Sequence, residues 1–247
     1  MCAEPFRWPE HYTSAVSLSF DDARPSQARF AAPILDAFGL RGTFYVVPKG
    51  LNQELEAWKG VLARGHEIGN HTTTHPCTGN FTFTRSNALE DYTLERMEAD
   101  IQECTRQTQS LLGVTPETFA YPCGNTFVGR GAEVKSYVPI IAQHFLAGRG
   151  YPGEYHNDPL FCDLAQLQGR VIDNTAPEVI LEWVKQSQKE GGWMVFAAHD
   201  VGPKPGPQVV LEESLRALCA YLHAPENGIW VAPVADVARH VVAHRPA

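Results

Sequence analysis

Short runs of β-branched and aromatic residues alternate with amphipathic helical stretches from one end of this 247-residue chain to the other. The expected strands are residues 15–20, 43–47, 66–69, 119–121, 144–147, 169–172, 194–198 and 229–231. The expected helices are residues 27–38, 53–64, 87–112, 134–143, 177–190, 211–222 and 234–244. Strands separated by helices pair in parallel, so the pattern predicts an α/β fold with a largely parallel sheet.

The number of strands indicates how such a sheet is arranged. Seven or eight parallel strands in one chain of this length favour a distorted (β/α) barrel over an open sheet, and such a barrel places its active site at the carboxyl ends of the strands. No linker or repeat divides the chain, so we expect a single catalytic domain spanning residues 1–247. Residues 150–168 form one long irregular segment that is suited to the rim of a binding groove.

Charge and hydropathy exclude several classes of partner. The net charge of −8 argues against a general affinity for nucleic acid or for an anionic membrane surface. No run approaches the roughly 20 apolar residues that a membrane span needs, so we expect no membrane association and a soluble protein. Residues 1–5 carry no recognisable signal peptide, which predicts either an intracellular protein or one whose leader has been removed.

Ten histidines and six cysteines are the residues from which metal sites are built. The cysteines are scattered with no C-x-x-C pair, so we expect most to be ordinary thiols that supply no metal ligand, with one disulfide left open.

Two adjacent carboxylates, Asp21 and Asp22, directly follow the first expected strand. Their side chains must diverge, so one can bind a cation while the other faces a substrate. The structural alternative is that an aspartate at a strand end caps the following turn. The alternative is weakened by a second polar cluster at the end of another strand.

That second cluster contains His71 and His75, four residues apart, so that one tight turn presents both rings on the same side. It differs from the H-E-x-x-H pattern, because Asn70 stands where the second histidine would be. A lone histidine pair is often structural, but Asp22 can complete a three-ligand site. Mixed nitrogen and oxygen ligands suit Zn²⁺ and leave Co²⁺, Ni²⁺ and Fe²⁺ open.

Two further strand ends carry candidate residues. His199 follows the strand at 194–198 and can donate a proton near pH 7, the alternative being a surface loop histidine. The strand at 119–121 runs into Pro122-Cys123-Gly124, a turn whose backbone N–H groups can face an oxyanion.

Taken together, these motifs resemble those of polysaccharide deacetylases of the NodB-homology type, the family-four carbohydrate esterases. Ser19-Phe20-Asp21-Asp22 is similar to the family's T/S-F-D-D motif, and His71 to His75 resembles its H-S/T-x-x-x-H motif. The resemblance implies that Asp21 is the catalytic base, that Asp22, His71 and His75 hold the metal, and that His199 is the general acid.

The third motif departs from the common R-P-P-Y-G form. It reads Tyr121-Pro122-Cys123-Gly124 after Ala120, a variant of F-A-Y-P-x-G that lacks the arginine beside the base. Arg149 is the candidate substitute. Asp173 is the candidate for orienting the acid His199, and Asp163 is the second choice.

The resemblance implies metal-dependent removal of N- or O-linked acetyl groups from a carbohydrate. The Cys123 N–H would then stabilise the oxyanion. Aromatic residues are candidate contacts for the sugar: Tyr121, Trp193, Tyr151, Tyr155 and Phe161. Three alternatives stay open, namely a hydrolase of small amides, a thiol enzyme using Cys123, and a non-catalytic glycan-binding protein. The particular glycan and the oligomeric state are left undetermined.

Overall fold

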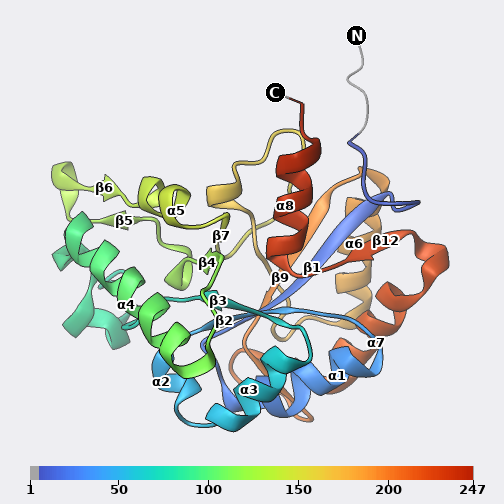
Figure 1. Cartoon of the computed structure of the whole chain (residues 1–247), viewed down its shortest axis with the longest axis horizontal. Helices are drawn as coiled ribbons and strands as arrows, with labels where there is room; N and C mark the ends of the chain where they lie inside the picture. The colour runs from blue at the N-terminus through green and yellow to red at the C-terminus, as the bar shows by residue number, and fades with distance from the viewer. Residues whose placement is uncertain (1–5, 247) are drawn as a thin grey trace.

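A computed structural model describes residues 6–246, so the predictions for residues 1–5 lie outside the described residues. Eight parallel strands form the main sheet: β1 (Ser14–Asp21), β2 (Thr43–Val46), β3 (Glu67–Asn70), β4 (Thr118–Ala120), β7 (Ala147–Arg149), β8 (Arg170–Val171), β9 (Trp193–Ala198) and β12 (Ile229–Val231). Their order is β7-β4-β3-β2-β1-β9-β8, and β12 pairs with the beginning of β1. The predicted α/β class with seven or eight parallel strands is confirmed (Figure 1).

The sheet curls until its two edges meet. β7 at one edge forms a parallel bridge from Arg149 to Leu167, just before β8 at the other edge. The Leu167 N–H donates to Gly148 O at 2.8 Å, and the Gly150 N–H donates to Leu167 O at 2.7 Å. Edge-to-edge pairing of this kind gives the distorted (β/α) barrel that the strand count predicts.

Eight α-helices surround the strands in the described part of the chain: α1 (Ala32–Ala37), α2 (Pro48–Leu51), α3 (Leu55–Ala63), α4 (Leu94–Leu112), α5 (Val138–His144), α6 (Pro177–Lys189), α7 (Glu212–His223) and α8 (Val234–His244). The helix predicted over residues 87–112 begins later, at Leu94, because the Thr93 side chain caps it by accepting from the Arg96 N–H. Gly113, with φ +74°, ends this helix.

Two small β pairs lie outside the main sheet and were not predicted. β5 (Phe127–Val128) and β6 (Lys135–Ser136) form an antiparallel hairpin, whereas β10 (Asp200–Gly202) and β11 (Val209–Leu211) pair in parallel after β9. Each strand has only two or three residues, too few for a periodic pattern to be recognised.

Alternation along β1 separates two hydrophobic cores. Val16, Leu18 and Phe20 pack in a core that includes residues of α1, α6 and α7. Ala15 belongs to a second core, where residues of α8 pack against β9. Since alternate side chains of a strand point to opposite faces, Ser17, Ser19 and Asp21 share the face of Ala15. Asp21 therefore lies at the carboxyl end of β1 on the inner face of the barrel.

No helix in residues 6–246 is both long enough and apolar enough to cross a membrane.

Candidate active site

Asp21 and Arg149 form a buried ion pair across the barrel. An Arg149 Nη2–H donates to Asp21 Oδ1, and the two side chains are 0% and 3% exposed. Burial opposes the charged form of Asp21, but the guanidinium and the nearby His71 lower its pKa below the usual value of 3.8. The structure thus brings Arg149 to the carboxylate that sequence reasoning assigned to it.

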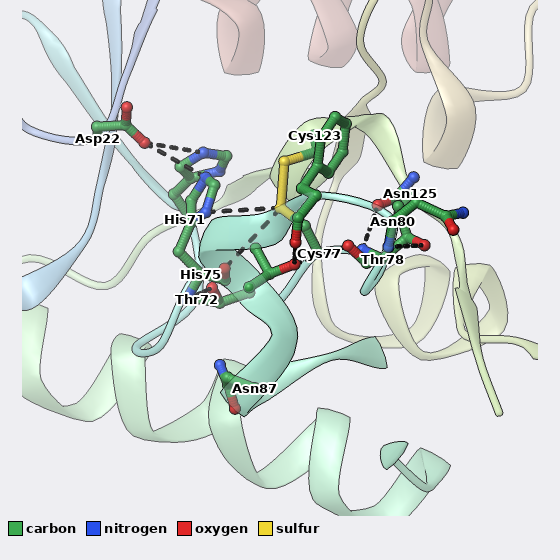
Figure 2. Close-up of a disulfide and its surroundings, with 12 residues drawn as sticks. Asp22, His71, Thr72, His75, Cys77, Thr78, Asn80, Asn87, Cys123 and Asn125 are labelled. Carbon is green, nitrogen blue, oxygen red and sulfur yellow. Dashed lines mark hydrogen bonds and ion pairs between the residues drawn. A yellow bond between two sulfur atoms is a disulfide. The ribbon is translucent and has the colours of Figure 1, made fainter. Parts of the chain in front are cut away.

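Asp22, His71 and His75 converge beside this pair (Figure 2). Asp22 Oδ1 lies 3.6 Å from His71 Nε2 and 3.4 Å from His75 Nε2. Asp22 follows β1 with a left-handed backbone, φ +80°, which turns its carboxylate away from the direction of Asp21. The three side chains predicted to bind a metal are therefore grouped around one point.

The donor atoms of this group suit a divalent cation. The Nδ1–H of His71 donates to Ala120 O at 2.8 Å, which leaves the Nε2 lone pair directed to the cluster. Burial lowers the pKa of His71 to about 4, so the ring is neutral at pH 7, as ligation requires. Two imidazole nitrogens and one carboxylate oxygen form the open type of site that catalytic zinc occupies. The residues therefore fit the predicted metal.

A second layer of charge holds Asp22 in place and was missed by sequence reasoning. Arg24 donates to Asp22 Oδ2 from Nε at 3.0 Å and from Nη2 at 2.9 Å. Its Nη1 donates to Asp200 Oδ2 at 2.7 Å. Although burial raises the pKa of Asp22, the two histidines and Arg24 lower it to about 2, so the carboxylate is ionised. The A-R dipeptide after Asp22 carries no signal that would have predicted this role.

His199 stands at the end of β9 and is hydrogen-bonded to Asp173. Its Nδ1 lies 2.5 Å from Asp173 Oδ2, and its backbone N–H donates to Asp173 Oδ1 at 3.0 Å. Burial lowers the pKa of His199, but the hydrogen bond that its ring donates to Asp173 and the charge of Asp21 outweigh this effect and raise the pKa. The second choice, Asp163, instead accepts from the Ala165 N–H in a distant turn.

The turn after β4 places Cys123 beside the metal-binding loop, where it forms a disulfide with Cys77. The one disulfide that the sequence left open is therefore this pair, so the Cys123 side chain has a structural contact in addition to the backbone role expected of it. A disulfide sulfur is no nucleophile or metal ligand, which also removes the thiol-enzyme alternative for this form of the protein. The next residue, Gly124, has φ +71°, and a Cβ at this position would lie 1.4 Å from Tyr151 O, so no residue with a side chain fits there without moving the backbone.

A cavity of about 550 Å³ opens over these groups. Asp21, Asp22, His71, His75, Cys123, Tyr151 and His199 line it. Phe81 and Phe83 also line the cavity. Their rings are stacked with the centroids 5.5 Å apart, and the two residues are 43% and 70% exposed. Sequence reasoning missed this pair because Phe83 lies in a short 3-10 helix, Thr82–Asn87, and Phe81 directly precedes it, and so short an element has no recognisable periodicity.

Two of the three residues assigned to substrate binding lie elsewhere. Trp193 is fully buried at the amino end of β9, the end opposite the site, and its Nε1–H donates to Ser17 Oγ at 3.0 Å. Tyr121 is 1% exposed, and its hydroxyl donates to Ala165 O at 2.7 Å. Both act as packing residues, so these two assignments are wrong.

Tyr151 lines the cavity, and its ring is roughly perpendicular to the His199 ring, with the two ring centroids 5.5 Å apart. Of the two further aromatic candidates, Tyr155 donates its hydroxyl to Glu190, and Phe161 is 82% exposed; neither lines this cavity.

The fold and this constellation agree with a known family of proteins. The family model described as polysaccharide deacetylase matches residues 10–135, about half of the chain. The protein therefore belongs to the polysaccharide deacetylase family.

Comparison with individual proteins gives the extent of the similarity. The chain is 29% identical to a gellan lyase of a Bacillus species over 261 aligned residues, which include 96% of this chain and 10% of that protein. The chain thus spans a tenth of that curated relative. A crystal structure provisionally assigned as a polysaccharide deacetylase of Mycobacterium smegmatis has a TM-score of 0.69 at 18% identity, with 100% of this chain and 98% of that one covered.

The same fold also occurs in a protein described as a CE4 family pseudoenzyme, from Bacillus anthracis. Its TM-score is 0.61 at 18% identity, with 93% of this chain and 66% of that one covered. At this level of identity the likeness concerns the fold alone. The residues of the site therefore decide whether the present chain can act as an enzyme.

Proposed function

We propose that this protein is a metal-dependent hydrolase that removes acetyl groups from a carbohydrate polymer. The observation that carries the proposal is the convergence of three units on one cavity. These are the ligand group around Asp22, the buried Asp21–Arg149 pair and the Asp173–His199 pair. A cation site, a base and an acid within one cavity are the parts that metal-assisted hydrolysis requires.

Asp22, His71 and His75 would hold the cation, with Zn²⁺ the best match to their donor set and Co²⁺, Ni²⁺ or Fe²⁺ also compatible. When bound, such a cation supplies Lewis acidity to water and to the substrate carbonyl. The chain itself prepares the ligands, because Ala120 O fixes the His71 ring and Arg24 fixes Asp22.

Asp21 acts as the general base that takes a proton from the attacking water. Its lowered pKa keeps it ionised at neutral pH, and the Arg149 guanidinium holds the carboxylate in one orientation. Gln27 also connects the two catalytic segments, because its side-chain amide donates both to Asp21 O and to His199 O. The ends of β1 and β9, which carry the base and the acid, are thereby held together.

His199 acts as the general acid that protonates the departing amine or alcohol. The Asp173 carboxylate accepts from Nδ1, so the proton available to the substrate is on Nε2. The raised pKa of His199 maintains this protonated form to higher pH than an unpaired histidine would allow.

The Cys123 N–H is the donor proposed for the oxyanion that forms when water adds to the acetyl carbonyl. Within residues 6–246 this N–H makes no hydrogen bond to another group of the chain, and Cys123 lines the cavity. A preorganised donor of this kind stabilises charge that develops only in the transition state.

The aromatic lining of the cavity favours a sugar over a small amide. The stacked and exposed rings of Phe81 and Phe83 offer an apolar surface of the kind that the C–H face of a pyranose covers. Hydrolysis of a small amide on the same site is the second candidate. A purely glycan-binding role is disfavoured because binding alone needs neither the buried base nor the paired acid.

Acetate release over a panel of acetylated glycans and small acetylated amides tests the proposal, with the metal removed by a chelator and then restored. We expect release from at least one glycan, its loss on chelation and its return with Zn²⁺. Release only from small amides would favour the second candidate. No release from any substrate by metal-loaded protein would refute the hydrolase proposal.

A further inference from the structure

A disulfide joins two loops of the proposed active site. Cys77 lies two residues after the metal-ligand candidate His75, and Cys123 supplies the proposed oxyanion donor 46 residues further along. Figure 2 shows the yellow sulfur bond between the two loops, on the side of His75 away from Asp22. The bond therefore connects the parts of the site that would contact the cation and the oxyanion.

Further contacts also hold the two loops together. The Thr78 N–H donates to the Asn125 side-chain oxygen at 3.0 Å, which ties the same two loops a second time. The Leu89 N–H donates to Cys77 O at 3.0 Å. His75 Nδ1 lies 3.7 Å from Cys77 Sγ, so the sulfur also borders the ring that is to bind the metal.

The backbone on both sides of the disulfide has an unfavourable conformation. His75 has φ +50° and Cys123 has φ +53°, the left-handed region that residues with a Cβ rarely adopt. Such conformations persist where the surrounding structure holds them. The Cys77–Cys123 bond is made by one of these residues, Cys123, and begins two residues after the other, His75.

We propose that the Cys77–Cys123 disulfide is a redox-sensitive positioning device, which holds the His75 imidazole and the Cys123 N–H in the geometry needed for catalysis. This inference rests on the proposed deacetylase function and adds a condition to it, since only the oxidised chain has full activity. Disulfides persist in oxidising compartments and are reduced in the cytosol of most cells. The device would therefore confine activity to an oxidising environment.

The bond can be reached by a reductant. Cys77 is fully buried, but Cys123 is half-buried and lines the cavity. A water-soluble phosphine reduces the disulfide to two thiols. Its phosphorus is oxidised to the phosphine oxide, and one water supplies the oxygen atom and the two protons. A phosphine is preferred to a dithiol because a dithiol would also compete for the metal.

The test compares kcat, KM, bound metal and thermal unfolding for oxidised wild type, phosphine-reduced wild type and the double variant Cys77→Ser/Cys123→Ser. Cys162→Ser is the matched control, because Cys162 is a free, partly exposed thiol outside the site. Measurements are made well below the unfolding temperature of every sample. Bound metal is counted because reduced Cys77 and Cys123 would offer new ligands beside His75.

We expect kcat for acetate release to fall roughly 100-fold on reduction, the scale of a misplaced catalytic group, with KM and metal content little changed. The double variant should have the same low kcat, and the phosphine should not lower it further. Reoxidation should restore the wild type, and Cys162→Ser should respond as the wild type does.

Equal kcat in the oxidised and reduced wild type would overturn the positioning proposal. A loss of kcat that only follows a loss of folded protein or of bound metal would also overturn it, because the bond would then serve stability alone. Absence of acetate release from the oxidised, metal-loaded wild type is a different failure, since it refutes the proposed function itself.

Discussion

Replacement of Arg149 by methionine would remove the partner of a buried carboxylate. The Asp21 and Arg149 side chains are 3% and 0% exposed, so water cannot replace the lost guanidinium. Removing one member of a buried ion pair costs about 3–5 kcal/mol of the free energy of unfolding. At about 2–4 °C per kcal/mol for a chain of this size, the unfolding temperature of Arg149→Met should fall by roughly 6–20 °C at pH 7.

The same substitution should change the pH dependence in a definite direction. In the wild type the pKa of Asp21 is lowered, so the carboxylate contributes stability above its usual pKa of 3.8 and loses it as the pH falls. Without Arg149, burial raises this pKa, and the variant loses stability as the pH rises. The difference in unfolding temperature should therefore shrink between pH 7 and pH 4, and the acid limb of kcat/KM should move to higher pH.

Calorimetry at several pH values and a pH profile of acetate release measure both effects. The control is Asp21→Asn/Arg149→Met, which removes the charge together with its partner and should recover much of the lost stability. If Arg149→Met unfolds within a degree or two of the wild type and its acid limb does not move, the assigned role of this pair is refuted.

Three further substitutions test the other parts of the site. Asp173→Asn should lower the pKa of His199, whose folded-state pKa is raised, so the alkaline limb of kcat/KM should move to lower pH; an unmoved limb would exclude His199 as the acid. His75→Ala should lower the metal content measured by elemental analysis, and unchanged content would show that the cation binds elsewhere. Phe81→Ala/Phe83→Ala should raise KM for an acetylated polymer about fivefold, from roughly 1 kcal/mol of lost apolar contact, without changing kcat for a small acetyl ester; an unchanged polymer KM would remove the pair from substrate binding.

The sequence predicted the barrel because each main strand and helix carries a periodic pattern and because parallel strands must be connected by helices. It also predicted the group around Asp22, since polar residues directly after apolar strands meet at one edge of a parallel sheet. Asp173 and Arg149 could be proposed on the same ground. Their pairing with Asp21 and His199 was expected from the family resemblance, and the structure adds the burial and the distances of both pairs.

Other features depend on contacts that one sequence does not specify. The pairing of Cys77 with Cys123 is one of many connectivities that six cysteines allow. Trp193 was assigned to the substrate although it begins β9 and faces the core at the opposite end of the barrel. The Phe81–Phe83 pair lies at the start of a 3-10 helix too short to show periodicity, so only the structure shows that it borders the cavity.

We propose that the adjacent carboxylates Asp21 and Asp22 have separate tasks, the first as base and the second as metal ligand. The most direct test measures acetate release and bound metal per chain in Asp21→Asn. We predict that this variant keeps wild-type metal content and loses acetate release. Loss of metal together with activity, or activity that survives the substitution, would show that the roles of Asp21 and Asp22 are wrongly assigned.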